Sequence, residues 1–159
     1  MIRTAIIILY VLPATAVLSM IAIIVAFFSR TGNPVHIIAR IWAKYILFVS
    51  GIGVTVEGLA NIDPSQSYIY MSNHQSNFDI PVLLSELPVQ FRWLAKAELF
   101  KIPIFGRGMR GCGYISIDRS NRKSAFKSLA DAAQRIRDGA SVLIFPEGTR
   151  SRDGEIGPF

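Results

Sequence analysis

Apolar residues fill the N-terminal part of the chain almost without interruption. Residues 5–28 include no charged side chain and consist mainly of isoleucine, valine, leucine, alanine and phenylalanine. About 20 apolar residues in a helix span the hydrocarbon core of a bilayer, so this segment is long enough to cross one. A cleaved signal peptide has a shorter apolar region that ends at small residues, whereas this one ends in Phe-Phe-Ser-Arg. The pattern predicts a retained membrane anchor that either spans the bilayer or, with a kink at Pro13, lies in it as a hairpin.

A second helix is predicted after a break at residues 31–34, Thr-Gly-Asn-Pro, because glycine ends helices and proline can open them. In residues 35–51, His36, Arg40 and Lys44 recur every four positions, which places them in one stripe on an otherwise apolar helix. Beside a membrane anchor, this pattern indicates an interfacial helix whose basic stripe faces lipid head groups. A surface helix on a soluble core would show the same spacing. We therefore assign residues 1–51 to membrane-anchoring helices.

Short strands alternate with helices from residue 52 onward. Strands are predicted where β-branched and aromatic residues cluster, at residues 53–58, 67–72, 91–95, 114–118 and 141–145. Helices are predicted at residues 78–85 and 121–138, the second with one apolar face made of Phe126, Leu129, Ala130, Ala133 and Ile136. This alternation indicates an α/β fold for residues 52–159, a layered sheet with flanking helices. The last strand is continuously apolar, as in the middle of a buried sheet, and no element follows it. We therefore expect the C-terminal part of this domain to be missing.

Composition and charge narrow the possible partners. Hydrophobic residues make up 51% of the chain, so part of it is expected to meet lipid. Of its 17 lysines and arginines, 13 lie in residues 92–152, together with five acidic residues. Such a surface suits an anionic membrane face, a phosphorylated substrate or nucleic acid. Few aromatic residues interleave with the basic ones and no nucleic-acid-binding motif is present, which favours lipid phosphate. The single cysteine, Cys112, permits no intrachain disulfide and fits a reducing compartment.

A polar segment, MSNHQSNFDIP, separates two apolar runs at residues 71–81. His74 is a candidate general base, because imidazole titrates near neutral pH. Asp79 lies five residues later, and a carboxylate beside a histidine fixes its tautomer and supports the imidazolium that forms. If Asp79 lies in the first turn of a helix that begins just after His74, the two side chains come within hydrogen-bonding reach. Taken alone, this spacing is explained as well by an ordinary capped helix.

Polar groups also follow three of the other predicted strands. In FPEGTRS, Gly148 allows a ligand to approach the backbone, Thr149 adds a hydroxyl, and Arg150 offers a bidentate fork for phosphate. Arg119 follows the strand in GYISIDRS, and Lys96 follows the strand in WLAKAEL. Each has a simpler explanation: a polar turn after a core strand, an arginine paired with a surface acid, and a solvated lysine.

Together, these segments resemble the glycerolipid acyltransferase family, in particular its 1-acyl-sn-glycerol-3-phosphate acyltransferases, which convert lysophosphatidic acid to phosphatidic acid. The first family block, Asn-His-x-x-x-x-Asp, is matched by Asn73, His74 and Asp79. The block that ends in arginine is matched by residues 113–119, and the block Phe-Pro-Glu-Gly-Thr-Arg-Ser is matched in full by residues 145–151. The resemblance covers about residues 52–159. The family's fourth block, a later strand with valine or isoleucine before proline, is absent from this chain.

The resemblance implies a reaction and the residues that carry it. His74 would remove the proton of the acceptor's free 2-hydroxyl while Asp79 orients the ring, and the acyl group would come from acyl-CoA or acyl carrier protein. No metal, cofactor or covalent acyl-enzyme is required. The implied substrate-binding residues are Lys96, Arg119, Glu147, Gly148, Thr149 and Arg150. The expected location is the inner or cytoplasmic membrane, with the active site on the cytoplasmic face.

Three other functions stay open from the sequence. A related acyltransferase could act on another lysophospholipid or on an amino-lipid acceptor, because the family blocks are shared. A metal-dependent hydrolase could use His74, Asp79 and Glu147, although one histidine with no second ligand at metal spacing makes a poor site. A basic, membrane-bound phospholipid binder without catalytic activity is the third.

Overall fold

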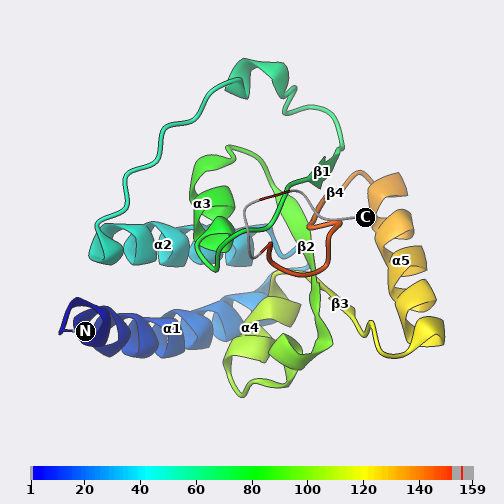
Figure 1. Cartoon of the computed structure of the whole chain (residues 1–159). Helices are drawn as coiled ribbons and strands as arrows, with labels where there is room; N and C mark the ends of the chain where they lie inside the picture. The colour runs from blue at the N-terminus through cyan, green and yellow to red at the C-terminus, as the bar shows by residue number, and fades with distance from the viewer. Residues whose placement is uncertain (1, 152–154, 156–159) are drawn as a thin grey trace.

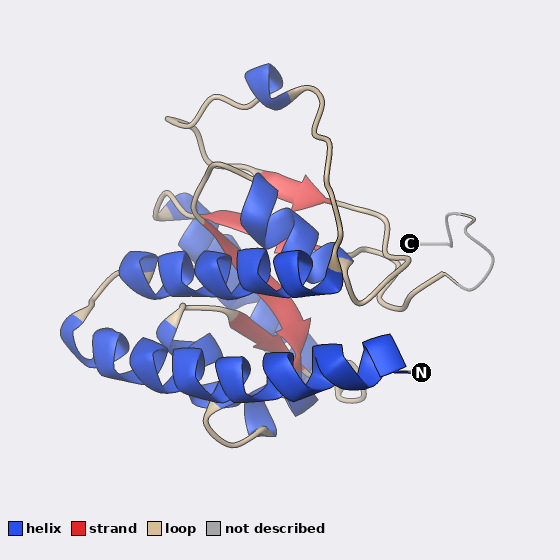
Figure 2. Ribbon diagram, turned by 90° about the vertical axis from the view of Figure 1, so that its left-hand side faces the viewer, coloured by secondary structure: helices blue, strands red, loops and turns tan. Residues whose placement is uncertain are grey.

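Two long helices open the chain. A computed structural model describes residues 2–151 and 155, and it begins with α1 (Ile2–Phe28) and α2 (Asn33–Ser50), which lie side by side and antiparallel (Figure 2). The turn between them contains Gly32, whose φ is 73°. A Cβ at Gly32 would lie 2.9 Å from the carbonyl oxygen of Cys112. Glycine is needed here because both the left-handed backbone and this close approach disfavour a side chain.

Within residues 2–151, four strands form one parallel sheet in the order β1-β4-β2-β3 (Figure 1). They are β1 (Ile69–Met71), β2 (Phe91–Lys96), β3 (Ile115–Ile117) and β4 (Ser141–Ile144). The connections between successive strands carry α3 (Asp79–Glu86), then η2 (Ala97–Lys101) and α4 (Phe105–Gly111), then α5 (Arg122–Arg137). A short helix, η1 (Leu59–Asn61), lies in the long loop before β1. This architecture confirms the α/β fold class predicted from the alternation of elements.

Apolar packing on both faces of the sheet holds the layers together. On one face, Phe91 and Trp93 of β2 pack with Ala43 of α2 and Leu84 of α3. On the other face, β3 and β4 pack against Ala132 of α5. Burial of a large apolar side chain contributes about 1.5–3 kcal/mol. Helix α1 packs against α2 and α4, so the N-terminal helices are built onto the layered domain.

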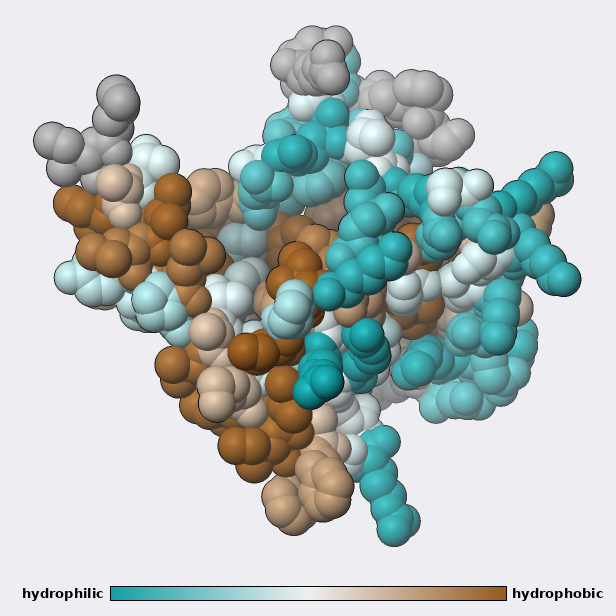
Figure 3. Space-filling model, turned by 90° about the horizontal axis from the view of Figure 1, so that it is seen from below, coloured by the Kyte–Doolittle hydropathy of each residue, from teal (hydrophilic) through white to brown (hydrophobic). Residues whose placement is uncertain are grey.

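Helix α1 carries an exposed apolar surface. Its segment Thr4–Phe28 is long and apolar enough to cross a membrane, and Leu9 and Phe27 are 68% and 86% exposed. Figure 3 shows apolar side chains gathered on the side of the molecule that α1 occupies, and polar side chains on the opposite side. The Trp42 Nε1 group of α2 donates a hydrogen bond of 2.9 Å to Thr15 Oγ1 of α1. This surface indicates membrane association, and whether α1 spans the bilayer or lies in it stays a prediction.

The prediction of an exposed basic stripe on α2 is wrong for His36, its first residue. His36 is completely buried, and its Nδ1 lies 3.1 Å from the hydroxyl of Tyr114. Burial first, and then the charges of two neighbouring arginines, lower the pKa of His36 to about 3, so its ring is neutral at physiological pH. The outward face of α2 is largely apolar instead, and Ile37, Ile41 and Phe48 are among its exposed residues. A spacing of four positions identifies a helical face but not the direction in which it points.

Two further expectations differ from the structure. Residues 53–58 form no strand and belong to the exposed loop before η1, because β-branched residues need a neighbouring strand and a core to pack on. The predicted apolar face of α5 is largely outward, with Phe126 60% and Leu129 47% exposed. Of the predicted face, Ile136 packs against the sheet core. Small residues also face the sheet: Ala132 is buried, and the hydroxyl of buried Ser128 donates to the carbonyl oxygen of Ser116 at 2.6 Å. Helices η2 and α4 were not predicted.

Gly106 in α4 is expected to tolerate no side chain. A Cβ there would overlap the backbone carbonyl of Phe100, and backbone cannot move aside as a flexible side chain can. We expect Gly106→Ala to lower the free energy of unfolding by about 1–3 kcal/mol, measured by urea unfolding in detergent micelles. Gly53→Ala is the matched control, because a Cβ at Gly53 meets nothing within 4 Å. Equal stabilities of the two variants would contradict this account.

Candidate active site

The candidate residues lie at the carboxyl ends of the strands. His74 follows β1, Lys96 ends β2, Arg119 follows β3, and the segment that contains Gly148 follows β4. All four strands are parallel, so these ends lie at the same edge of the sheet, which is where ligands bind in open α/β folds. The topology therefore gathers residues from four separate parts of the sequence.

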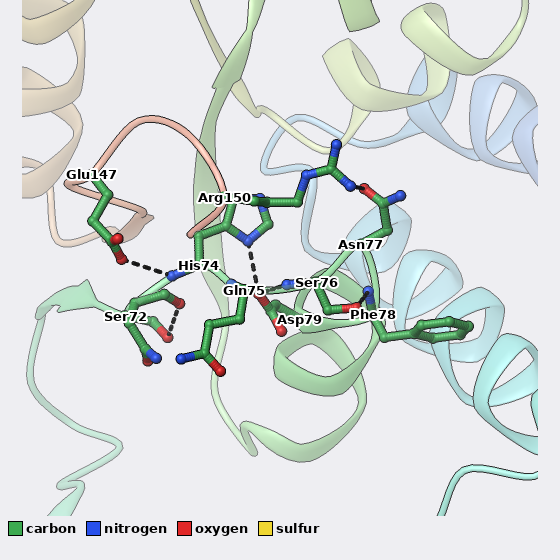
Figure 4. Close-up of polar contacts among 10 residues, drawn as sticks. Ser72, His74, Gln75, Ser76, Asn77, Phe78, Asp79, Glu147 and Arg150 are labelled. Atoms are coloured by element: carbon green, nitrogen blue, oxygen red, sulfur yellow. Dashed lines mark hydrogen bonds and ion pairs between the residues drawn. The ribbon is translucent and has the colours of Figure 1, made fainter. Parts of the chain in front are cut away.

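His74 and Asp79 form a hydrogen-bonded pair (Figure 4). Asp79 is the first residue of α3, and its Oδ2 lies 2.7 Å from Nδ1 of His74. The same oxygen accepts hydrogen bonds from the backbone amides of Gln75, at 2.8 Å, and Ser76, at 2.9 Å. With Nδ1 engaged by the carboxylate, Nε2 is the ring atom that can accept a proton from a substrate.

Electrostatics keep the Asp79 carboxylate charged. Partial burial acts to raise its pKa, but the hydrogen bonds from the Ser76 amide, the His74 ring and the Gln75 amide outweigh burial and hold the pKa below its usual value. A carboxylate that accepts several hydrogen bonds is favoured in its ionised form. Asp79 is therefore ionised at neutral pH and able to stabilise an imidazolium on His74.

The loop after β4 holds the backbone of His74 on both sides. Oε1 of Glu147 accepts a hydrogen bond of 2.9 Å from the amide of His74 (Figure 4), and the amide of Ser151 donates one of 2.7 Å to the carbonyl oxygen of His74. Glu147 was predicted to bind substrate. The structure places its carboxylate on the backbone of the candidate base, and Glu147 is not among the described residues that line the cavity of about 920 Å³ described below.

Two arginines reach the same region from different loops. Arg119 donates a hydrogen bond from a guanidinium nitrogen to the carbonyl oxygen of Gly148. Gly148 has a φ of 72°, and a Cβ there would lie 2.6 Å from the Arg119 guanidinium, so a side chain at this position would displace the arginine. Arg150 donates to the side-chain oxygen of Asn77 at 2.9 Å. Guanidinium groups held in this way can present their other N–H groups to a phosphate.

A cavity of about 920 Å³ lies between the strand ends and the N-terminal helices. The polar residues that line it include His74, Lys96, Arg119, Thr149 and Arg150, and Gly148 also lines it. The helices contribute an apolar lining that includes Leu18, Ala22, Ile38, Leu84 and Met109. Cationic groups and apolar helix surfaces in one cavity suit an amphiphile with an anionic head group.

Some functional residues were missed by sequence reasoning. Asn77, Gln75 and Ser76 all lie in the polar segment that contains His74. Because a helix begins at Asp79, the backbone amides of Gln75 and Ser76 could have been predicted as partners of its carboxylate. The ring of Phe145 stacks on His74. No local sequence signal predicts this contact, because the pairing of β1 with β4 brings the two residues together. Among the described residues, no group of three or more His, Cys, Asp or Glu could hold a metal ion.

Comparison with known proteins gives consistent matches. A family model described as Acyltransferase matches residues 53–159. The chain is 39% identical over 125 residues to a chloroplastic 1-acyl-sn-glycerol-3-phosphate acyltransferase of Arabidopsis thaliana, a match that covers 78% of this chain and 35% of that protein. It is 34% identical over 137 residues to the 1-acyl-sn-glycerol-3-phosphate acyltransferase of Helicobacter pylori, a match that covers 85% of this chain and 56% of that protein.

A solved structure extends the likeness to nearly the whole chain. The crystal structure of the 1-acyl-sn-glycerophosphate acyltransferase from Thermotoga maritima aligns with a TM-score of 0.76 at 28% identity, covering 98% of this chain and 65% of that one. The matches confirm the resemblance seen in the sequence. This chain spans about a third to just over half of the length of the two curated relatives, 35% and 56%.

Acid should remove the stability that the Asp79 carboxylate contributes. Its folded-state pKa is depressed, so this contribution is present above the unfolded-state pKa of about 3.9 and is lost as the pH falls through the folded-state value. Asn cannot ionise, so the difference in unfolding free energy between the wild type and Asp79→Asn should be constant above about pH 5 and shrink as the pH falls below that value. Urea unfolding at a series of pH values measures it, with exposed Asp131→Asn as the control. A difference that stays constant below about pH 5 as well would show that the carboxylate adds no such stability.

Proposed function

This chain belongs to the acyltransferase family, and on that premise we propose that it transfers a fatty acyl group to the 2-hydroxyl of 1-acyl-glycerol 3-phosphate. The product is phosphatidic acid, an intermediate of phospholipid synthesis. The observation that carries the proposal is the 2.7 Å contact between His74 Nδ1 and Asp79 Oδ2, placed in a cavity that Arg119 and Arg150 also line. That cavity combines a general base with cations suited to a phosphate.

The chemical step needs only proton transfer and an acyl thioester. Nε2 of His74 takes the proton of the 2-hydroxyl as the hydroxyl oxygen attacks the thioester carbonyl carbon, and a carbon–oxygen bond forms. The tetrahedral oxyanion collapses with cleavage of the carbon–sulfur bond. The departing thiolate takes the proton from the His74 imidazolium, so the products are an ester and a free thiol. Asp79 stabilises the imidazolium between these two proton transfers.

The two ends of the acceptor would bind to different parts of the cavity, the phosphate to basic residues and the acyl chain to apolar ones. Arg119 and Arg150 would bind the phosphate, with Lys96 near the reacting centre and Gly148 and Thr149 contributing backbone and hydroxyl groups. The helix side chains in the cavity suit the acyl chain of the acceptor. The exposed apolar surface of α1 supports a site at a membrane surface. We propose that this surface is the cytoplasmic face of the inner or cytoplasmic membrane, with acyl-CoA or acyl carrier protein as the donor.

An acyl-transfer assay tests the proposal. The complete gene product in detergent micelles, given lysophosphatidic acid with acyl-CoA or with acyl carrier protein thioester, should form phosphatidic acid and release one thiol per ester formed. Mass spectrometry detects the lipid and a thiol reagent detects the leaving group. Acylation of another lysophospholipid or of an amino-lipid in place of lysophosphatidic acid would favour the related acyltransferase. Lipid binding without any acylation would favour a non-catalytic phospholipid binder.

Replacement of the general base should slow turnover and leave acceptor binding intact. We expect His74→Ala to lower kcat by about 10²–10⁴-fold, the usual loss when general-base catalysis is removed, while lysophosphatidic acid still binds. Asp79→Asn should also lower kcat, because an amide favours the wrong imidazole tautomer. Initial rates and equilibrium lipid binding separate the two effects. A turnover close to that of the wild type would remove His74 from this role.

Loss of either arginine should weaken use of a phosphorylated acceptor. A charge-assisted hydrogen bond contributes about 1.5–3 kcal/mol, so Arg119→Ala and Arg150→Ala should each raise the apparent KM for lysophosphatidic acid by about tenfold or more. The KM for the acyl donor should stay nearly unchanged. Arg119→Lys should restore binding only in part, because an ammonium lacks the bidentate fork.

The control for these variants is Arg137→Ala, since Arg137 lies on α5 and bonds Gln134 rather than a site residue. The measured quantity is the preference for lysophosphatidic acid over a neutral monoacylglycerol. A preference that survives both arginine substitutions would show that these residues do not bind the phosphate.

A further inference from the structure

The imidazole of His74 is held on its face as well as at its edge. The phenyl ring of Phe145 stacks on it, with ring centroids 4.0 Å apart and ring planes inclined by 10°. The hydrogen bond to Asp79 fixes the Nδ1 edge, but a single hydrogen bond permits the ring to tilt about that contact. A flat aromatic face 4.0 Å away leaves no space for such a tilt toward Phe145.

Phe145 is itself supported by a rigid wall of aromatic residues. It is the first residue after β4, and its ring lies 5.3 Å from that of Trp93. Trp93 in turn packs at 5.4 Å against Phe91, and these two residues are 4% and 0% exposed. Because both belong to β2, next to β4 in the sheet, the ring of Phe145 is positioned by the core as well as by the loop that it begins.

We propose that Phe145 is a positioning residue for His74, an inference that rests on the proposed function of His74 as the general base. Its ring keeps the imidazole in the plane in which Nδ1 faces Asp79 and Nε2 is presented to the acceptor hydroxyl. Its π face also lies where it attracts the positive charge that His74 gains during proton transfer. Both effects act in the transition state more than in the complex with bound substrate.

A role confined to core packing makes a different prediction. If Phe145 only fills space, any apolar side chain that preserves stability should preserve turnover. If it positions the ring, the requirement is a flat aromatic face, and a flexible apolar side chain of similar size should fail even in a stable protein. The aromatic requirement is what separates the two accounts.

Steady-state kinetics of the complete gene product provide the test. We expect Phe145→Leu and Phe145→Met to lower kcat by about tenfold, a loss in the range of cation–π and positioning effects, with the KM for lysophosphatidic acid unchanged. Phe145→Tyr should retain a kcat near that of the wild type. Phe100→Leu is the matched control, because Phe100 is a buried phenylalanine (7% exposed) that does not line the cavity. It should lower stability and leave kcat unchanged.

A spectroscopic measurement tests the stack without reference to activity. The chain contains two histidines, so selective histidine labelling and a His74→Ala reference assign both rings in an NMR spectrum. Ring protons of His74 should be shifted upfield by the face of Phe145, and this shift should disappear in Phe145→Leu and persist in Phe145→Tyr. The signals of His36, whose ring contacts Phe91 at 4.8 Å, should move much less than those of His74.

The outcomes separate the two proposals. A wild-type protein that transfers no acyl group to any lysophospholipid would overturn the proposed function. An active wild type whose Phe145→Leu and Phe145→Met variants keep full kcat would overturn only the positioning role. Absence of the upfield shift in the wild type would overturn the stacked arrangement on which that role depends.

Discussion

Parallel pairing on both sides of β4 is the constraint on which the site depends. Leu143 lies opposite Tyr70 of β1 and opposite Trp93 of β2, and it is completely buried, so the register of the central strand is fixed by its core side chains. A slip by one residue would turn Leu143 to the other face of the sheet. It would also carry Phe145 and the loop beyond it away from His74.

The loop after β4 combines two tasks. It offers Gly148, Thr149 and Arg150 to the cavity, and it holds His74 through Glu147 and the stacked ring of Phe145. The groups assigned to the acceptor and the supports of the base therefore share one stretch of backbone. A displacement of this stretch would therefore move the groups assigned to the acceptor and the supports of His74 together.

The surface of the molecule, like its cavity, has an apolar part and a polar part. In the view of Figure 3, apolar side chains gather on the side that α1 occupies, and hydrophilic side chains gather on the opposite side. The cavity lies where the two meet, lined by Leu18 and Ala22 of α1 as well as by Arg119 and Arg150. An amphiphilic substrate could leave its apolar part beside the membrane-facing helices while its phosphate reaches the cations. Under the proposed function, this arrangement would keep the apolar chain of the acceptor out of water during the reaction.

The sequence by itself determined the features that depend on neighbours along the chain. The length of α1, the α/β class, and the closeness of His74 and Asp79 follow from apolar runs and from a helix that starts five residues after the histidine. Only the tertiary structure decided which faces are buried: His36 lies inside, and Phe126 lies outside, against the direction that their helical spacing suggested. It also decided the contact of Glu147 with His74, residues separated by 73 positions, and the stack of Phe145 on the same histidine. Such pairings arise from strand order in the sheet, and local periodicity carries no information about which strands become neighbours.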